Sequence, residues 1–377
     1  TLNHEKYSLQ SGFLAYENLN KDKNSDRYEY VLPYYNFSTV IDENYFNGSI
    51  TLGSSGSNKL TNTNDLKSSL INDITYSSND YISNFGYKND FNVVFKNLNS
   101  LGKKNSDYKS SPQVELLTMI EANTSLPLIK KDKDYNNFLT PKLSFRFNPG
   151  DMKNHKNSNR TITTDNIFSN NRLGLEDSFE TGKSLTLGLD YKKEFLSEAN
   201  KYFELKLASV LRDRKENFLP QNTTLNKKQS NIFGSITNNF SDKFKLNYKF
   251  AVDQSLNEIQ YNDINATFSL NNFVTKFNFI KETDDMGDKN LIDNVTSYKF
   301  NENNSLNFNT RRNRKLNLTE YYDLVYEYKN DCLIAGIKYK KTYYEDRDLK
   351  PSEDLLFTIT LLPLTTYETR VDKLILE

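Results

Sequence analysis

The sequence predicts an all-β protein, a large antiparallel up-and-down transmembrane β-barrel of the outer-membrane type. Three observations support this prediction. Apolar and polar residues alternate along long segments, short and long connections alternate between these segments, and the second face of each segment is polar. Strands with lipid on one side and water on the other have this pattern, and only closed barrels and helices satisfy their backbone polar groups in lipid.

The alternation of apolar and polar residues is clearest in the second half of the chain. Apolar residues occupy every second position from Phe244 to Val252, with Lys and Asn between most of them. The same period of two returns in the ranges 203–207, 264–270, 322–328, 333–339 and 355–361. Each segment is about twice as long as a typical strand of a soluble sheet. No stretch shows a comparable helical period, so we expect a predominantly β chain.

The connections between these segments alternate in length from Asn231 onward. Those predicted to be short are 238–242, 271–272, 301–304 and 329–331, and the longer ones are 253–262, 281–290, 311–318 and 344–354. Hairpin turns on one rim and longer loops on the other are typical of an up-and-down meander, whereas Greek-key crossovers would break the alternation. Two further polar stretches, 99–111 and 151–170, are predicted to be long loops, either extracellular or folded into the lumen.

The composition excludes several classes of function. The 377 residues hold 49 Lys and Arg against 49 Asp and Glu, and this balance argues against a nucleic-acid-binding protein. One Cys excludes an internal disulfide framework, and two His, His4 and His155, have no partner at a useful spacing for a metal site. We therefore expect no catalytic, cofactor-binding or metal-binding residue, and no enzyme.

Two local features could have a function. Arg311, Arg312 and Arg314 form a basic cluster at a predicted hairpin loop. The cluster either contacts phosphorylated lipid headgroups, which Arg binds in bidentate fashion, or is an ordinary solvated loop. Cys332 is either an inert buried thiol or, in a secreted protein, half of a disulfide to a segment outside this chain.

Three blocks of the sequence have recognisable residues. The first holds Val31-Leu32-Pro33 and Gly48; the second holds Leu139-Thr140-Pro141, Phe147, Pro149, Asp165-Asn166-Ile167-Phe168, Asn171-Arg172, Glu180, Gly182 and Gly188-Leu189; the third holds Asn330-Asp331-Cys332-Leu333, Gly336-Ile337, Tyr339, Tyr344-Glu345-Asp346-Arg347-Asp348, Pro351 and Leu355-Leu356-Phe357. Together they resemble the LptD family of lipopolysaccharide-assembly proteins, particularly its alphaproteobacterial forms.

The resemblance implies that residues 1–377 are a C-terminal barrel domain in the outer membrane of a Gram-negative bacterium. The chain begins at Thr1 without a signal peptide, so we expect a partial barrel that lacks its first strands and the family's N-terminal periplasmic jellyroll. The implied function is insertion of lipopolysaccharide into the outer leaflet through a lateral gate. The implied partners are an LptE-like plug lipoprotein, an LptA-like periplasmic bridge reached through the missing domain, lipopolysaccharide and outer-membrane lipid.

The resemblance also assigns roles to particular residues. The strand carrying Leu355, Phe357, Ile359 and Leu361 would form one side of the gate, and Pro363 just beyond it would limit strand pairing because proline lacks an amide donor. By family analogy, Cys332 would pair with a cysteine of the missing periplasmic domain. Two alternatives stay open from the sequence: a porin- or receptor-type channel for solutes, and a soluble Asn-rich β adhesin.

Overall fold

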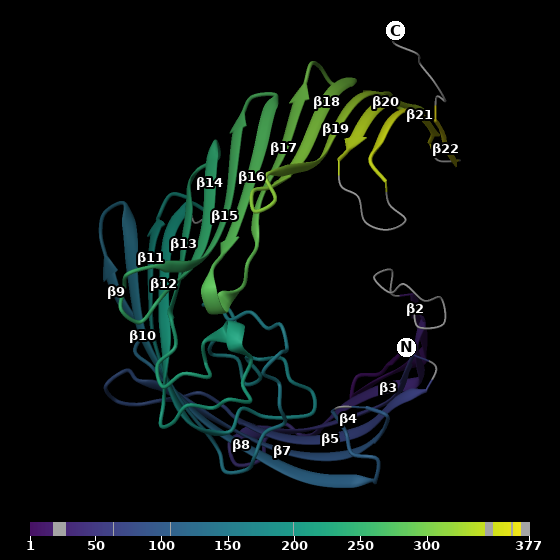
Figure 1. The fold of residues 1–377 in the computed structure, drawn as a ribbon. Coiled ribbons are helices and arrows are strands. Elements are labelled where there is room, and N and C mark those ends of the chain that lie inside the picture. The colour runs from purple at the N-terminus through teal and green to yellow at the C-terminus, as the bar shows by residue number, and fades with distance from the viewer. Residues whose placement is uncertain are drawn as a thin grey trace. The chain divides into compact units, whose positions relative to one another are not determined.

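The computed structural model describes residues 1–17, 28–62, 64–105, 107–198, 200–343, 350–362 and 365–370 (Figure 1). Its regular structure in these ranges consists of β-strands and two short 3₁₀ turns, which confirms the all-β prediction. No helix within the described ranges has the length and apolar character needed to cross a membrane.

The strands follow one another along the chain with few interruptions. Their bounds are β1 Leu2–Asn3, β2 Tyr7–Glu17, β3 Tyr28–Asp42, β4 Gly48–Thr61, β5 Asp65–Ser78, β6 Tyr81–Ile82, β7 Lys88–Lys103, β8 Gln113–Ser125, β9 Leu128–Lys131, β10 Tyr135–Asn148, β11 Gly182–Phe195, β12 Tyr202–Arg212, β13 Ile232–Ser241, β14 Phe244–Val252, β15 Ile259–Leu270, β16 Phe273–Glu282, β17 Asn290–Lys299, β18 Asn304–Asn313, β19 Leu318–Lys329, β20 Leu333–Thr342, β21 Ser352–Leu361 and β22 Thr365–Arg370. The 3₁₀ turns are η2 Gln221–Thr223 and η3 Asp284–Met286.

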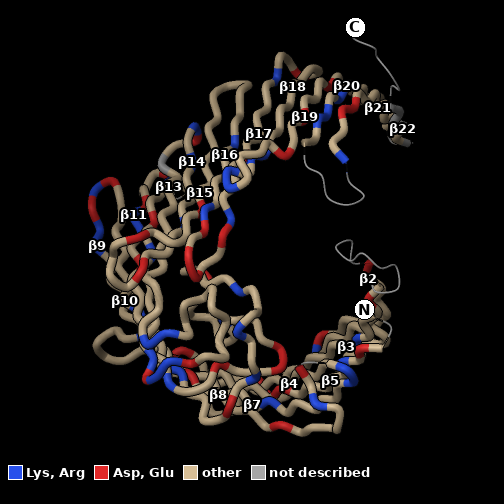
Figure 2. Tube along the Cα trace, viewed as in Figure 1, with Lys and Arg blue, Asp and Glu red and all other residues tan. Residues whose placement is uncertain are grey.

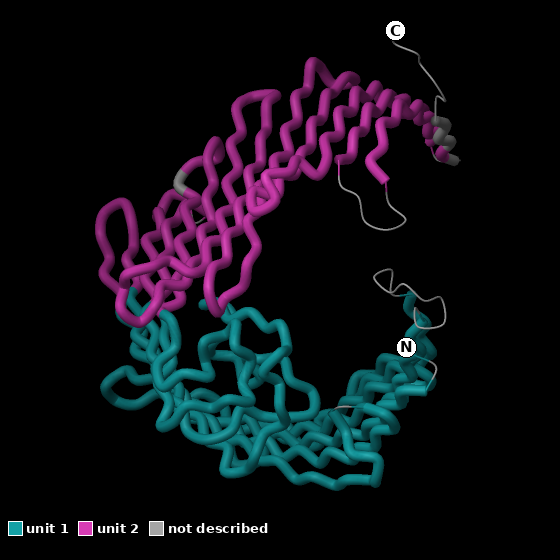
Figure 3. Tube along the Cα trace, viewed as in Figure 1, with its two compact units in different colours: residues 1–128, 139–189, 208–231 teal, residues 129–138, 190–207, 232–377 magenta. Residues whose placement is uncertain are grey.

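The chain divides into two compact units, shown in Figure 3. Unit 1 contains residues 1–128, 139–189 and 208–231, and unit 2 contains residues 129–138, 190–207 and 232–377. In unit 1 the antiparallel pairs run from β2 through β3, β4, β5, β7 and β8 to β10. In unit 2 every strand from β13 to β22 pairs antiparallel with the next. The predicted up-and-down order is therefore confirmed.

The register of unit 2 places the alternating apolar residues on one face. Tyr326 lies opposite Ile337, and Ile337 lies opposite Phe357, and the three are 40%, 43% and 38% exposed. The opposite face carries charge, with Lys338 Nζ 3.6 Å from Asp323 Oδ2. Figure 2 shows charged residues of both signs along the strands. The period of two thus produces an exposed apolar face and a charged face, as the sequence predicts.

The connections of unit 2 alternate as predicted, but most are shorter. One edge has 242–243, 271–272, 300–303 and 330–332, and the other has 253–258, 283–289, 314–317 and 343–351. The strands extend past the apolar positions because the backbone ladder does not depend on side-chain polarity. Polar residues such as Gln260 and Arg312 therefore belong to strands. The same effect corrects the predicted loop 99–111, since β7 continues to Lys103.

Unit 1 has a covered face as well as an exposed one. Val94 of β7 and Leu117 and Met119 of β8 are buried against Phe179 from the connection between β10 and β11. On the opposite face, Leu116 is 80% exposed. Of the two alternatives for the stretch 151–170, the structure therefore shows a segment folded against the sheet.

Candidate functional site

A long connection without regular secondary structure covers one face of unit 1. This covering segment, residues 149–181, joins β10 to β11. Side-chain hydrogen bonds replace regular structure in it: Asn171 Nδ2 donates to Leu175 O at 2.8 Å, and Leu175 N donates to Asn171 Oδ1 at 3.0 Å. The segment has its own apolar core, because Ile162, Ile167 and Leu175 are almost fully buried.

The connection 213–231, between β12 and β13, packs with the covering segment. His155 N donates to Phe218 O at 2.8 Å, and Asn222 Nδ2 donates to Asn159 Oδ1 at 2.7 Å. Leu219 and Leu225 of this connection are 0% exposed. The two connections therefore form one packed layer on the strands of unit 1 (Figure 3).

A buried carboxylate holds the end of the covering segment between two arginines. Glu180 Oε2 lies 2.8 Å from Arg172 Nε, and Glu180 Oε1 accepts from Arg172 Nη2 and from Arg212 Nη1. Arg172 Nη1 also donates to Thr186 Oγ1 of β11 at 2.9 Å. Burial alone raises the pKa of Glu180, but the charges of Arg172 and Arg212 outweigh burial and lower this pKa to about 2.

Two further charged pairs lie within the sheet, and the cation of each donates a hydrogen bond to a backbone carbonyl of the covering segment. Arg146 of β10 lies 2.9 Å from Glu121 of β8, and its Nη2 donates to Ser169 O at 2.6 Å. Lys96 Nζ of β7 lies 3.0 Å from Asp73 Oδ2 and donates to Glu176 O at 2.7 Å. Arg146 and Lys96 are therefore buried beneath the covering segment and help to hold it in place.

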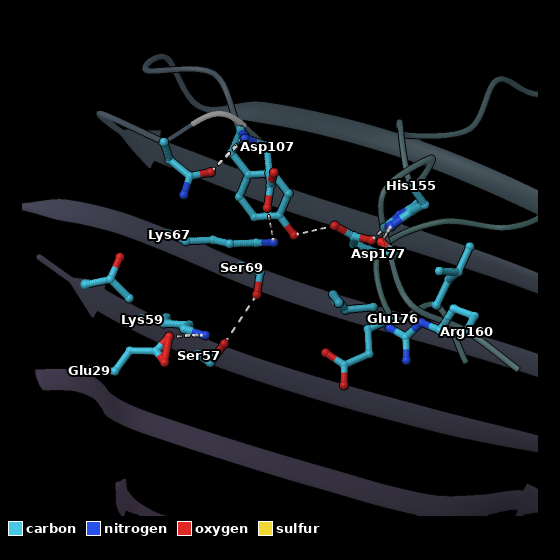
Figure 4. A pocket seen from close by; sticks show the side chains of 16 residues that line it. Glu29, Ser57, Lys59, Lys67, Ser69, Asp107, His155, Arg160, Glu176 and Asp177 are labelled. Carbon is cyan, nitrogen blue, oxygen red and sulfur yellow. Dashed lines mark hydrogen bonds and ion pairs between the residues drawn. The ribbon is translucent and has the colours of Figure 1, made fainter. Parts of the chain in front are cut away.

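A polar cavity of about 550 Å³ lies between the covering segment and the strands β3, β4 and β5 (Figure 4). Its strand side carries two ion pairs, Lys59 with Glu29 at 2.5 Å and Lys67 with Asp107 at 3.0 Å. Arg160 lines it from the covering segment. This mixture of charges solvates a polar or phosphorylated group and does not suit an acyl chain.

One wall of this cavity is formed by three polar side chains in contact, Tyr108, Asp177 and His155. Tyr108 Oη donates to Asp177 Oδ2 at 2.9 Å, and His155 Nε2 lies 3.2 Å from Asp177 Oδ1. Burial alone raises the pKa of Asp177, but the hydrogen bonds from His155 and Tyr108 lower it to about 2. Burial and then Asp177 raise the pKa of Tyr108. Sequence spacing missed the partner of His155 because Asp177 reaches it only through the fold of the segment.

The structure places Cys332 in the turn 330–332 between β19 and β20. It is exposed and free, its amide donates to Asn330 Oδ1 at 3.0 Å, and its carbonyl accepts from Leu362 N at 2.8 Å. This turn is on the edge of unit 2 that has the other short turns. The alternative of an inert buried thiol is therefore wrong. The predicted disulfide stays a prediction.

The predicted arginine cluster at one loop is wrong in its geometry. Arg311 and Arg312 belong to β18. Arg311 lies opposite Asp293 of β17, and Arg312 lies opposite Ile292. Because successive strand residues point to opposite sides, the two arginines are on different faces of the sheet. Arg311 Nε is 2.5 Å from Asp293 Oδ1 on the charged face. Only Arg314 lies in the turn itself. Contact of these arginines with lipid headgroups stays a prediction.

The four predicted gate residues share the apolar face of β21. Leu355, Phe357, Ile359 and Leu361 lie opposite Tyr339, Ile337, Ala335 and Leu333 of β20. However, β21 is not the last strand, because β22 pairs with it from Leu356 to Leu361. Pro363 lies outside the described residues. The gate role of this strand is a prediction that the geometry leaves untested.

Comparison with known proteins found one family. A family model described as "LptD: LPS transport system D" matches residues 1–304. The match includes the covering segment and the second block of family-like residues, whereas the third block, from Asn330 onward, lies beyond it. No curated protein matches the sequence.

Several solved structures are similar to the chain at low identity. A ferric enterobactin receptor (PfeA) mutant from Pseudomonas aeruginosa has 8% identity and a TM-score of 0.42, with 95% of this chain and 68% of the receptor covered. The siderophore receptor PirA from Acinetobacter baumannii has 8% identity and a TM-score of 0.41, with coverages of 94% and 68%. At these values the similarity assigns neither a fold nor a substrate to this chain.

Replacing Glu180 by Gln should detach the covering segment. The substitution leaves Arg172 and Arg212 buried without a counter-charge, which costs about 3 to 5 kcal/mol when a buried pair loses one partner. We expect faster proteolysis within 149–181 in the folded protein. Glu353→Gln is the matched control, because Glu353 pairs with Lys341 on the surface and should give no change. Equal proteolysis of the two variants would contradict the assignment.

The covering segment should also detach in acid. Asp177 and Glu180 have ordinary pKa values of 3.8 and 4.5, and both fall to about 2 in the fold. A lowered pKa stabilises the folded state above the ordinary value, and this stability is lost as the pH falls toward the folded value. The protection of residues 149–181 against amide hydrogen exchange, measured relative to an unfolded chain at the same pH, should therefore decrease between about pH 4.5 and about pH 2. Protection that persists at the lower limit would exclude this linkage.

Proposed function

The chain belongs to the LptD family of the LPS transport system, and from this premise we propose that it inserts lipopolysaccharide into the outer leaflet through a lateral gate. Family membership makes it an outer-membrane β-barrel protein of lipopolysaccharide transport. The match over residues 1–304 carries this conclusion and favours it over a solute channel or a soluble adhesin. The proposed activity is transport: the protein would lower the energy barrier to moving a lipid into the outer leaflet, without making a covalent bond.

The two faces of the sheet support the proposal. Lipopolysaccharide has phosphorylated sugars and several acyl chains, so a transporter must provide a polar path beside an apolar surface. In unit 1 the charged face carries the cavity with Lys59, Lys67 and Arg160, whereas the other face exposes residues such as Ile74 and Phe95. We propose that the sugars pass along the charged face while the acyl chains move to the apolar one.

The C-terminal strands support a gate at this end of the sheet. The ladder between β20 and β21 runs from Leu333 to Thr342, whereas within the described residues, which end at residue 370, that between β21 and β22 covers Leu356–Leu361 of β21. Opening a seam in lipid leaves backbone groups without partners, so a shorter ladder opens at lower cost. We therefore propose that the gate includes β22 as well as the predicted strand β21.

The proposed partners fit different parts of the chain. We propose that an LptE-like plug lipoprotein contacts the charged face of unit 2, because the chain's own covering segment occupies that face of unit 1. An LptA-like bridge would deliver lipopolysaccharide through the family's periplasmic domain. Cys332 would link that domain to the turn between β19 and β20, where its thiol is exposed.

Photo-crosslinking can test the gate. A photoactivatable amino acid in place of Phe357 should capture lipopolysaccharide severalfold more than one in place of Phe277, during transport in cells. The two positions are matched, since both are on the apolar face of unit 2 and are 38% and 37% exposed. The reason is that β21, unlike β16, would border the exit path. Equal capture at the two positions would refute a gate at β21 and β22.

Electrophoresis can test the role of Cys332. The full-length protein should migrate differently under reducing and non-reducing conditions, and Cys332→Ser should remove part of this difference. Because Cys332 is exposed in a turn, the variant should fold normally. If the Cys332→Ser protein shows the same migration difference between the two conditions as the unsubstituted protein, the disulfide proposal is wrong.

A further inference from the structure

A row of uncharged polar side chains interrupts the apolar face of unit 1. Ser54 of β4 lies opposite Asn72 of β5, which lies opposite Asn97 of β7. The same face exposes Ile74 by 46% and Phe95 by 55%. Three neighbouring strands therefore place polar groups at one height on the face that elsewhere meets lipid.

This polar row is not the edge of the apolar face. The next row on one side consists of Leu52, Ile74 and Phe95, in register with one another. On the other side, nearer the long connections, the next two rows mix apolar and polar residues, Gly56 with Leu70 and Asn99, and Asn58 with Ser68 and Leu101, before Leu60 lies opposite Leu66. Polar groups on a face that meets hydrocarbon are unfavourable unless they are hydrogen-bonded.

The row forms a chain of hydrogen bonds that is extended by Tyr35 and Asn99. Tyr35 Oη lies 3.0 Å from Ser54 Oγ, which donates to Asn72 Oδ1 at 2.8 Å. Asn72 Nδ2 and Asn99 Nδ2 both donate to Asn97 Oδ1, at 3.3 Å and 2.7 Å. Within the part of the chain that the structure describes, the Nδ2 of Asn97 and the Oδ1 of Asn99 have no such bond. These two groups are available to a ligand.

A hollow of about 390 Å³ lies beside this chain of hydrogen bonds. Its lining includes Tyr35, Gly56, Leu70, Asn99, Leu101 and Val114. Gly56 leaves room for the ring of Tyr35 in this lining, because a Cβ there would lie 2.5 Å from Cε1 of Tyr35. The lining residues have no charged side chain, whereas the cavity on the other face of β4 and β5 is lined by Lys59 and Lys67.

We propose that this hollow binds lipopolysaccharide of the outer leaflet at the junction between its sugars and its acyl chains. That junction carries amide and ester carbonyls and hydroxyl groups, which suit the free amide oxygen of Asn99 in the lining and the amide nitrogen of Asn97, a residue that lies beside the hollow and is hydrogen-bonded to Asn99. Leu70 and Val114, 39% and 70% exposed, contact the first part of the acyl chains. The charged headgroup of a phospholipid finds no counter-charge in the lining. The inference rests on the proposed function, which supplies the lipid.

Crosslinking from two positions of one strand tests this site. The full-length protein is placed in nanodiscs of lipopolysaccharide and phosphatidylethanolamine, with a photoactivatable amino acid at Leu70 or Ile74. Both are exposed residues on the same face of β5. We expect about fivefold more lipopolysaccharide captured from Leu70, the effect of one or two hydrogen bonds. Equal capture, or capture of phospholipid or a protein in its place, would overturn the proposal.

Variants show whether the asparagines are responsible. Asn97→Leu with Asn99→Leu keeps the face compatible with lipid and should reduce capture from Leu70 to the level at Ile74. Thr118→Leu, opposite Phe95 on β8, is the control and should leave capture unchanged. Unchanged capture in the asparagine variant would refute the site. Because the nanodisc supplies the lipid directly, lost export with capture intact would count against the gate and not against the hollow.

Discussion

Every backbone amide and carbonyl of a strand that faces hydrocarbon must find its partner within the sheet, because the lipid offers none. This requirement explains why the strands continue through polar residues such as Arg312, and why the turns are short. It also explains part of the asparagine excess. Asn47, Asn271 and Asn317 adopt positive φ values of 57°, 50° and 51° at turns, a conformation that asparagine tolerates better than most residues.

The same requirement separates the two faces of each unit. Once the backbone is satisfied, successive side chains must point to opposite sides, so one face can be apolar while the other carries charge. In unit 2 the charged face holds pairs such as Lys338 with Asp323. In unit 1 it is covered by residues 149–181, and its charges become the buried attachments of that segment.

Buried charge gives the covering segment a defined position. Glu180 between Arg172 and Arg212, and Glu121 beside Arg146, fix the segment at several strands at once. Such pairs contribute little net stability compared with apolar contacts, but removing one partner is costly, so they favour one arrangement. The segment can therefore form a wall of a polar cavity although it has no regular secondary structure. In the proposed function, such a wall would provide a fixed charged surface beside the path of a phosphorylated headgroup.

The sequence by itself determined the all-β class, the order of the strands and the face of each alternating residue, because a period of two depends only on local backbone geometry. Its family-like residues also indicated the LptD family, which the family model shows. It missed the ends of strands, as at Arg311 and Lys103, since ladder pairing ignores polarity. Only the tertiary structure decided that residues 149–181 fold onto the sheet, and that His155 meets Asp177. It alone aligned Ser54, Asn72 and Asn97, because contacts between strands depend on register, which no single strand encodes.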